Sequence, residues 1–142
     1  MIMNNDNFLQ NLTKICGSQN VSQDPKDLKK YSKDLSFIKG KSPLYIVWPS
    51  NSQQVTNIVK LANELKFYII PVSLDSKFKH HGDSLPKKDN SIILNLSRMN
   101  KVLSIDRKNR VVMVEPGVSF DQLVPIPMIS RYCNWFSFES CC

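Results

Sequence analysis

Both histidines of the chain, His80 and His81, lie side by side at the centre of a polar stretch, PVSLDSKFKHHGDSLP, residues 71–86. Fourteen residues separate Pro71 from Pro86, whereas connections in compact domains usually take about 4–6. Loops of this length without secondary structure of their own tend to bind a ligand or to be disordered. We therefore treat this segment as the candidate binding loop; the alternative is a variable surface loop.

The four cysteines do not suggest a disulfide framework or a metal site. Three of them fall in the last ten residues and two are adjacent, an arrangement unsuited to disulfide pairing. No C-x-x-C pair occurs and neither histidine lies nearby, so we expect reduced thiols and no metal. The cysteines are Cys16, Cys133, Cys141 and Cys142.

Length and composition indicate one folded domain. The chain has 142 residues, 42% of them hydrophobic and 22% charged, which favours a packed core over a disordered chain. No apolar run approaches the roughly 18–20 residues of a membrane span, and the opening MIMNNDNFLQ is not typical of a secretory signal. We expect a cytoplasmic protein.

A net charge of +7 raises the possibility of nucleic-acid binding. Arginine, the usual residue for reading bases and gripping phosphates, occurs only four times, and no nucleic-acid-binding motif accompanies the lysines. We expect a solvated lysine face and no nucleic-acid partner. A non-catalytic basic module that binds a protein or nucleic acid remains the alternative function. The clustered lysines are Lys26, Lys29, Lys30, Lys33, Lys39 and Lys41.

The N-terminal segment, residues 1–42, is predicted to be helical in part. Apolar residues of the stretch NDNFLQNLTKIC, 5–16, fall on one helical face, and Gly17 is a suitable stop. A weaker helical segment, DPKDLKKYSKD, follows at 24–34, with Asp24 as its cap and Pro25 in its first turn.

The next segment has the pattern of a strand–helix–strand unit. LYIVW (44–48) and FYIIPV (67–72) are compact apolar runs typical of strands. Ser50 and Gln53 have the spacing of a capping box, and five apolar residues follow at helical spacing. Two strands joined through a helix should be parallel in one sheet. The helical apolar residues are Val55, Ile58, Val59, Ala62 and Leu65.

Three short apolar runs follow the polar loop, at 91–96, 101–105 and 110–115. We expect them to form antiparallel strands, with DRKN (106–109) as a hairpin turn. EPGV then makes a turn and Ser119 caps a short helix. The predicted fold class is therefore α+β. The tail, residues 125–142, has no helical or strand period and groups four aromatic residues, as though it were apolar surface without a partner.

The order of these elements carries a resemblance to a known family. PLYIVWPSNSQQVTNIVKLANELKFYIIPVS, then the polar loop, then SIILNLSRMNKVLSIDRKNRVVMVEPGVSFDQL, resembles the first lobe of the flavin domain of FAD-linked oxidases. This is the p-cresol methylhydroxylase and vanillyl-alcohol oxidase family, which includes glycolate oxidase and D-lactate dehydrogenase flavin subunits. The two stretches in this order are fairly specific, whereas either alone would be weak.

The resemblance implies that the loop cradles the FAD pyrophosphate with backbone N–H groups, which is why the family prefers glycine there. In this loop Gly82 is the one glycine, and lysines and histidines could compensate by charge. Covalent attachment of FAD through a histidine is a further possibility. The resemblance also places the Pro-Gly turn beside the flavin ring, the alternative being an ordinary strand-ending turn. The implied FAD-binding residues are Ser73, Leu74, Asp75, Ser76, Lys77, Phe78, His80, His81, Gly82, Asp83, Pro116 and Gly117.

We interpret the sequence as an N-terminal helical segment (1–42), a partial FAD-binding domain (43–124) and an unmatched tail (125–142). Family enzymes are much longer and take their catalytic residues mostly from parts without a counterpart here, so no catalytic residue can be named. The expected function is to supply the pyrophosphate-binding lobe of an enzyme that oxidises a hydroxy acid or alcohol, without activity alone. We expect that the chain is interrupted near Val124 by truncation or a change of reading frame.

Overall fold

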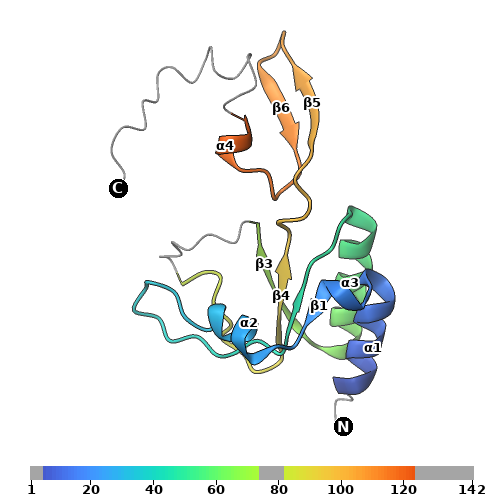
Figure 1. Ribbon diagram of the computed structural model, residues 1–142, viewed down its shortest axis with the longest axis vertical. Helices are drawn as coiled ribbons and strands as arrows, with labels where there is room; N and C mark the ends of the chain where they lie inside the picture. The colour runs from blue at the N-terminus through green and yellow to red at the C-terminus, as the bar shows by residue number, and fades with distance from the viewer. Residues whose placement is uncertain (1–4, 74–81, 124–142) are drawn as a thin grey trace.

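A computed structural model of the 142-residue chain describes residues 5–73 and 82–123 (Figure 1). The elements follow one another in an order that begins with helices and ends with a hairpin. They are α1 (Asn5–Cys16), a 3-10 turn (Ser18–Asn20), β1 (Val21–Ser22), α2 (Pro25–Lys30), β2 (Tyr45–Val47), α3 (Ser52–Leu65), β3 (Tyr68–Val72), β4 (Ser91–Asn95), β5 (Val102–Asp106), β6 (Val111–Val114) and α4 (Phe120–Leu123).

Four strands form one sheet in the order β1-β2-β4-β3, and the last three of these are parallel to one another. β2, α3 and β3 make the predicted strand–helix–strand unit, whose two strands are separated by β4. Tyr45 of β2 and Tyr68 of β3 lie at neighbouring levels, because their partners on β4 are Ile92 and Ser91. The short strand β1 adds to the outer edge of β2 in the antiparallel direction.

The run at 91–96 differs from its prediction in one respect. It was expected to pair in antiparallel fashion with the strands after it, but β4 is parallel and central in the first sheet. All five residues of β4 are buried, which is the pattern of a parallel strand covered on both faces. The antiparallel pairing predicted for the next two runs is confirmed, since β5 and β6 form a separate two-stranded hairpin across the turn at 107–110.

The helix boundaries follow the predicted caps closely. α1 ends before Gly17, whose φ of 86° requires a glycine. α2 is capped by Asp24 as predicted but ends at Lys30, earlier than its helical pattern. The capping box of α3 lies one residue later than predicted, because Asn51 Oδ1 accepts from the N–H of Gln54 at 2.9 Å.

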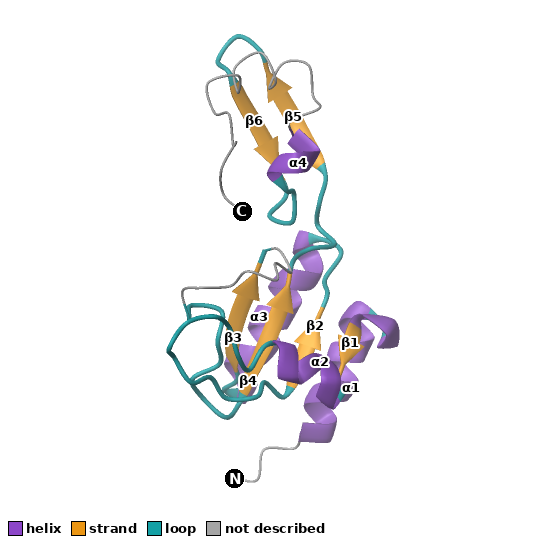
Figure 2. Ribbon diagram, turned by 60° about the vertical axis from the view of Figure 1, so that its left-hand side comes forward, coloured by secondary structure: helices purple, strands orange, loops and turns teal. Residues whose placement is uncertain are grey.

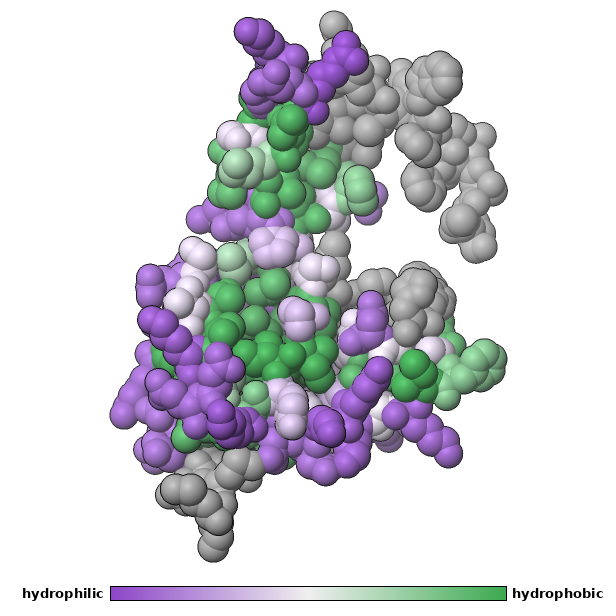
Figure 3. Space-filling model, turned by 180° about the vertical axis from the view of Figure 1, so that it is seen from behind, coloured by the Kyte–Doolittle hydropathy of each residue, from purple (hydrophilic) through white to green (hydrophobic). Residues whose placement is uncertain are grey.

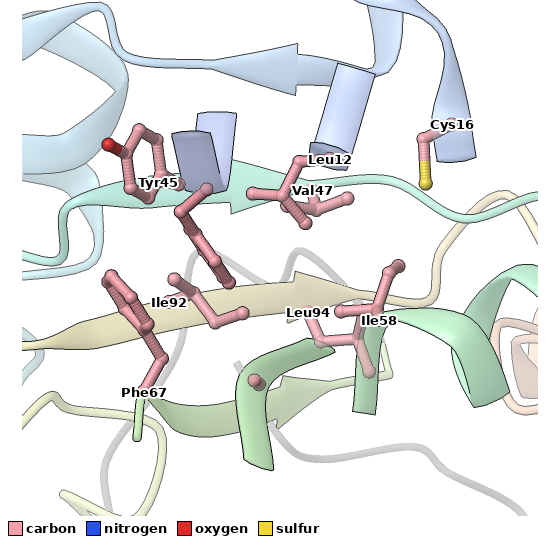
Figure 4. Close-up of a cluster of buried hydrophobic side chains, with 10 residues drawn as sticks. Leu12, Cys16, Tyr45, Val47, Ile58, Phe67, Ile92 and Leu94 are labelled. Carbon is pink, nitrogen blue, oxygen red and sulfur yellow. The ribbon is translucent and has the colours of Figure 1, made fainter. Parts of the chain in front are cut away.

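One face of the sheet packs against α1 and α3 and forms the main core (Figure 4). Phe8 of α1 stacks on Phe67 with ring centroids 3.8 Å apart, and Tyr45 lies at 5.6 Å from Phe8. The N-terminal helix is thus part of the same core as the strand–helix–strand unit. The buried members of this cluster are Phe8, Leu12, Cys16, Tyr45, Val47, Ile58, Ala62, Phe67, Ile92 and Leu94.

The opposite face of the sheet carries a smaller apolar cluster. Ile46, Val72 and Ile93 point to this face and are buried together with Tyr31, which follows α2. In Figure 1, α2 lies on the side of the sheet away from α1 and α3. The residues around α2 therefore supply the second layer that a central parallel strand requires.

The hairpin β5–β6 extends beyond the first sheet and exposes apolar side chains (Figures 1 and 3). Val102, Ile105 and Met113 are exposed to 37%, 37% and 59%, and each belongs to one of its two strands. Among the helices that the structure describes, none has the length and apolar character to cross a membrane.

The packing of α3 generates a stability prediction. Ile58 is fully buried, whereas the neighbouring Val59, also expected to be buried, is 38% exposed. Replacing Ile58 with alanine should lower the free energy of unfolding by about 2–5 kcal/mol, because it leaves a cavity between α3 and the sheet. The matched change Val59→Ala should cost less than about 1 kcal/mol. Denaturant unfolding of both variants provides the measurement, and equal losses would contradict the packing described.

Burial of Cys16 generates a prediction about pH. Loss of solvent raises the pKa of the Cys16 thiol from 9.0 to about 11. Because the folded pKa is the higher one, the thiol's contribution to stability is complete below about pH 9 and is lost as the pH rises towards 11. The destabilisation caused by Cys16→Ala should therefore shrink between these limits. Denaturant unfolding under reducing conditions at both pH values measures it, and a constant difference would refute the prediction.

Candidate functional site

The carboxyl ends of the three parallel strands meet at one edge of the sheet (Figure 2). Ligands of open sheets with parallel strands bind outside this edge, where the connections leave the strands. β2 leads into Trp48 and Pro49, β3 into Ser73, and β4 into Leu96. Figure 2 shows the hairpin beyond the same edge, so the chain crosses this region again at the end of β6.

The amino end of α3 lies at this edge, since α3 follows β2 after four residues. Asn51 caps the helix, and the Oε1 atom of Gln54 accepts from the N–H of Ser50 at 2.8 Å. The first-turn N–H groups of a helix are not used inside it and carry partial positive charge. This 14-residue helix therefore contributes a mildly anion-attracting end to the edge.

The end of β4 is held by a buried polar pair. Nδ2 of Asn95 donates to the hydroxyl of Tyr31 at 2.8 Å, and Oδ1 of Asn95 accepts from the N–H of Ser97 at 3.0 Å. Both side chains are buried, so the pair fixes where β4 ends. We did not predict either residue; the signal was a lone asparagine within the apolar run SIILNL.

A charged side chain lies over the edge at the same place. The Arg98 guanidinium is 5.8 Å from the centroid of the Trp48 ring, a cation–π distance that joins the turn after β4 to the end of β2. Arg98 is exposed, and Trp48 is half-buried. The arginine therefore keeps hydrogen-bond donors available to an anionic ligand.

The structure describes five of the twelve predicted binding residues, and the other seven lie outside the described residues. Ser73 is exposed directly after β3. Gly82 and Asp83 follow the loop, and Pro116 and Gly117 follow β6. Together with Ser73 they are the five predicted residues whose positions the structure gives. Leu74, Asp75, Ser76, Lys77, Phe78, His80 and His81 are the ones that fall outside.

Gly82 is buried, with a φ of 65° that favours glycine. Its N–H donates to Oδ2 of Asp34 at 2.7 Å, so this donor is engaged within the protein. A Cβ at this position would collide with the side chain of Ile38. The adjacent Asp83 is exposed.

Gly117 meets the turn that follows β4. Its N–H donates to the carbonyl of Met99 at 2.8 Å, and a Cβ would lie 2.5 Å from the carbonyl oxygen of Leu96. The Pro-Gly turn and the carboxyl end of β4 are therefore in direct backbone contact. Pro116 is exposed beside this contact. The structure thus brings Gly117 and its neighbour Pro116, in addition to Ser73, to the edge where Arg98 and the end of β4 lie.

A shallow cavity lies elsewhere, at the opposite end of β3. Its lining residues are Ala62, Asn63, Lys66, Phe67 and Tyr68. None of the predicted binding residues lines it, and it lies at the amino end of β3, away from the carboxyl ends of the parallel strands. Among the described residues no group of three or more histidine, cysteine or acidic side chains is arranged to hold a metal.

Comparison with known proteins assigns a family to residues 43–139, that of the FAD binding domain. The matched range continues past Leu123, where the resemblance in the sequence was expected to end. The flavoprotein subunit of 4-cresol dehydrogenase [hydroxylating] from Pseudomonas putida is 31% identical over 117 residues, 81% of this chain and 22% of the relative. The mitochondrial D-2-hydroxyglutarate dehydrogenase of Arabidopsis thaliana is 30% identical over 77% of this chain and 19% of its own length.

Solved structures agree with this assignment. A crystal structure of p-cresol methylhydroxylase with substrate bound matches 92% of this chain with a TM-score of 0.74 and 28% identity. The 4-ethylphenol oxidase of Gulosibacter chungangensis matches the same share with a TM-score of 0.80 and 25% identity. The chain spans about a quarter of the length of each, 24% and 25%.

The close approach at Gly117 generates a prediction. Gly117→Ala should lower the free energy of unfolding by about 1–3 kcal/mol, because the atoms that a Cβ would meet belong to the backbone and cannot rotate away. Pro116→Ala, at the exposed neighbour, should change it by less than about 1 kcal/mol. Thermal or denaturant unfolding measures both, and a fully stable Gly117→Ala variant would mean that the turn does not pack as described.

Proposed function

Because the chain belongs to the family of the FAD binding domain, we propose that it supplies the FAD-binding part of an oxidoreductase that acts on a hydroxy acid or an alcohol. The observation that carries this proposal is the family match over residues 43–139, together with the 0.80 TM-score to a solved oxidase. The chain spans 22% of the length of its relative from Pseudomonas putida, so the activity of a whole enzyme is part of the proposal.

The described residues at the carboxyl edge fit an anionic dinucleotide. Backbone crowds the edge at Gly117, Ser73 is exposed, and Arg98 supplies positive charge. Two acidic side chains accept hydrogen bonds from backbone N–H groups. Asp34 accepts from the N–H of Gly82, and Glu115 accepts from the N–H of Lys101 at 2.8 Å. Both carboxylates thus accept hydrogen bonds from the backbone, which weakens their repulsion of a phosphate.

We assign the pyrophosphate to the edge formed by Ser73, the amino end of α3 and the predicted loop, and the flavin ring to the Pro-Gly turn. Bound FAD would supply the redox chemistry, as the acceptor of a hydride. The chain's own residues hold and orient the cofactor, and no catalytic acid or base is assigned among them. The chain alone is therefore proposed to bind FAD without oxidising substrate.

The substrate class is proposed from the names of the relatives. A 4-cresol dehydrogenase, a D-2-hydroxyglutarate dehydrogenase and a protein of Schizosaccharomyces pombe named as a putative D-lactate dehydrogenase are 30–33% identical to this chain. Their names point to a phenol and to hydroxy acids as substrates. A hydroxy acid or alcohol is the class that we propose for the complete enzyme.

The direct test is a titration of the purified chain with FAD, followed by flavin absorbance and fluorescence. Saturable binding is expected, and ADP, which carries the pyrophosphate, should compete, whereas riboflavin, which lacks it, should compete poorly. Absence of FAD binding, combined with salt-dependent binding to nucleic acid, would instead support a basic binding module.

The predicted loop lysines provide a mutational prediction. Changing both Lys77 and Lys79 to glutamate should weaken FAD binding at least about tenfold, because two positive charges beside a pyrophosphate become negative, at about 1 kcal/mol or more per contact. Equilibrium titration with FAD gives the two dissociation constants.

A matched control separates local from general charge. Lys14→Glu with Lys60→Glu changes two exposed lysines on α1 and α3 and lowers the net charge by the same four, from +7 to +3. This control should bind FAD within about twofold of the native chain, because screening weakens distant charges. Equal weakening in both double variants would assign the effect to net charge and the loop lysines to solvent.

A further inference from the structure

Residues 34–41, here called the strap, run beside residues 82–89. The N–H of Lys41 donates to the carbonyl of Pro86 at 2.7 Å, and the ammonium of Lys41 lies 2.6 Å from a carboxylate oxygen of Asp89. A Cβ on Gly40 would lie 3.1 Å from Cβ of Leu85, so the two segments also pack closely. The strap thus follows the chain from Gly82 towards β4.

Asp34 is the first residue of the strap, and its carboxylate accepts several hydrogen bonds. Oδ1 accepts from the N–H of Ser36 at 2.9 Å and from its hydroxyl at 2.5 Å, and Oδ2 accepts from the N–H of Gly82 at 2.7 Å. The two bonds to Ser36 orient the carboxylate within the strap. The third crosses 48 residues of sequence and is charge-assisted, a stronger kind than a bond between neutral groups.

Gly82 is held from a second direction by Ile38 of the strap. Its φ of 65° favours glycine, and a Cβ at this position would collide with the side chain of Ile38. Gly82 is therefore fixed by one hydrogen bond and by one apolar contact, both from the strap.

We propose that Asp34 is a positioning residue for FAD binding, which acts by fixing Gly82. The inference rests on the proposed function. Ser73 is fixed at the other end of the predicted loop, since Val72 just before it pairs with Asn95 and accepts from the N–H of Leu96 at 2.7 Å. Holding Gly82 as well fixes the backbone position of a second predicted binding residue before a ligand arrives, and such preorganisation lowers the cost of binding. Gly82 contributes through its position, because its N–H is already engaged by Asp34.

This role gives a prediction opposite in sign to simple electrostatics. Asp34 is an anion, so removing its charge should strengthen the binding of a pyrophosphate if charge alone mattered. Removing an anchor should weaken it. The direction of the change therefore distinguishes the two effects.

The experiment uses glycine-selective ¹⁵N labelling of the full chain, which contains four glycines. In Asp34→Ala the amide of Gly82 should exchange with solvent about tenfold faster or more, and FAD should bind about five- to tenfold more weakly. Gly117, whose N–H donates to Met99, is the internal control and should exchange as before. Glu64→Ala, which removes one exposed carboxylate from α3, should change neither quantity more than about twofold.

Exchange at Gly82 tests the anchor, and the affinity for FAD tests whether the anchor positions the binding region. An unchanged Gly82 exchange rate in Asp34→Ala, or an affinity for FAD that is unchanged or higher, would overturn the inference. If the native chain fails to bind FAD while Gly82 exchange still accelerates, the proposed function fails for this chain and the anchoring by Asp34 stands. Should Asp34→Ala not fold, Asp34→Asn keeps an acceptor oxygen without charge, and its Gly82 exchange should rise about two- to fivefold; no rise there would also overturn the inference.

Discussion

The insertion of β4 between β2 and β3 is the constraint on which the rest of the structure depends. Parallel strands must be joined by crossovers, so this order brings three carboxyl ends to one edge and sends three connections away from it. All five residues of β4 are buried, which requires cover on both faces of the sheet. α1 and α3 cover one face, and the residues around α2 cover the other.

The N-terminal residues serve the edge as well as the core. Phe8 packs under the sheet, Tyr31 bonds the end of β4 through Asn95, and Asp34 bonds Gly82 beyond β3. These contacts come from a part of the chain that precedes the family match at residue 43. The region that organises the proposed cofactor edge is therefore larger than the matched range.

Regular periodicity was sufficient to predict α1, α3 and the strand–helix–strand unit, because their apolar spacing reflects which face is buried. Periodicity could not predict the direction of β4, because a short apolar run is compatible with both a parallel and an antiparallel strand. The Pro-Gly turn was predicted from local residue types, whereas its contact with Leu96 depends on tertiary packing. Asp34 was not predicted either, because its partner Gly82 lies 48 residues away.

The central claim is that FAD binds at the carboxyl edge of the parallel strands. Backbone amide shifts of the ¹⁵N-labelled chain, followed during titration with FAD, test it residue by residue. The account predicts that the largest changes occur at Ser50, Ser73, Arg98 and Gly117, with little change around the cavity at residues 62–68. Changes concentrated at residues 62–68, or no change at any amide, would contradict it.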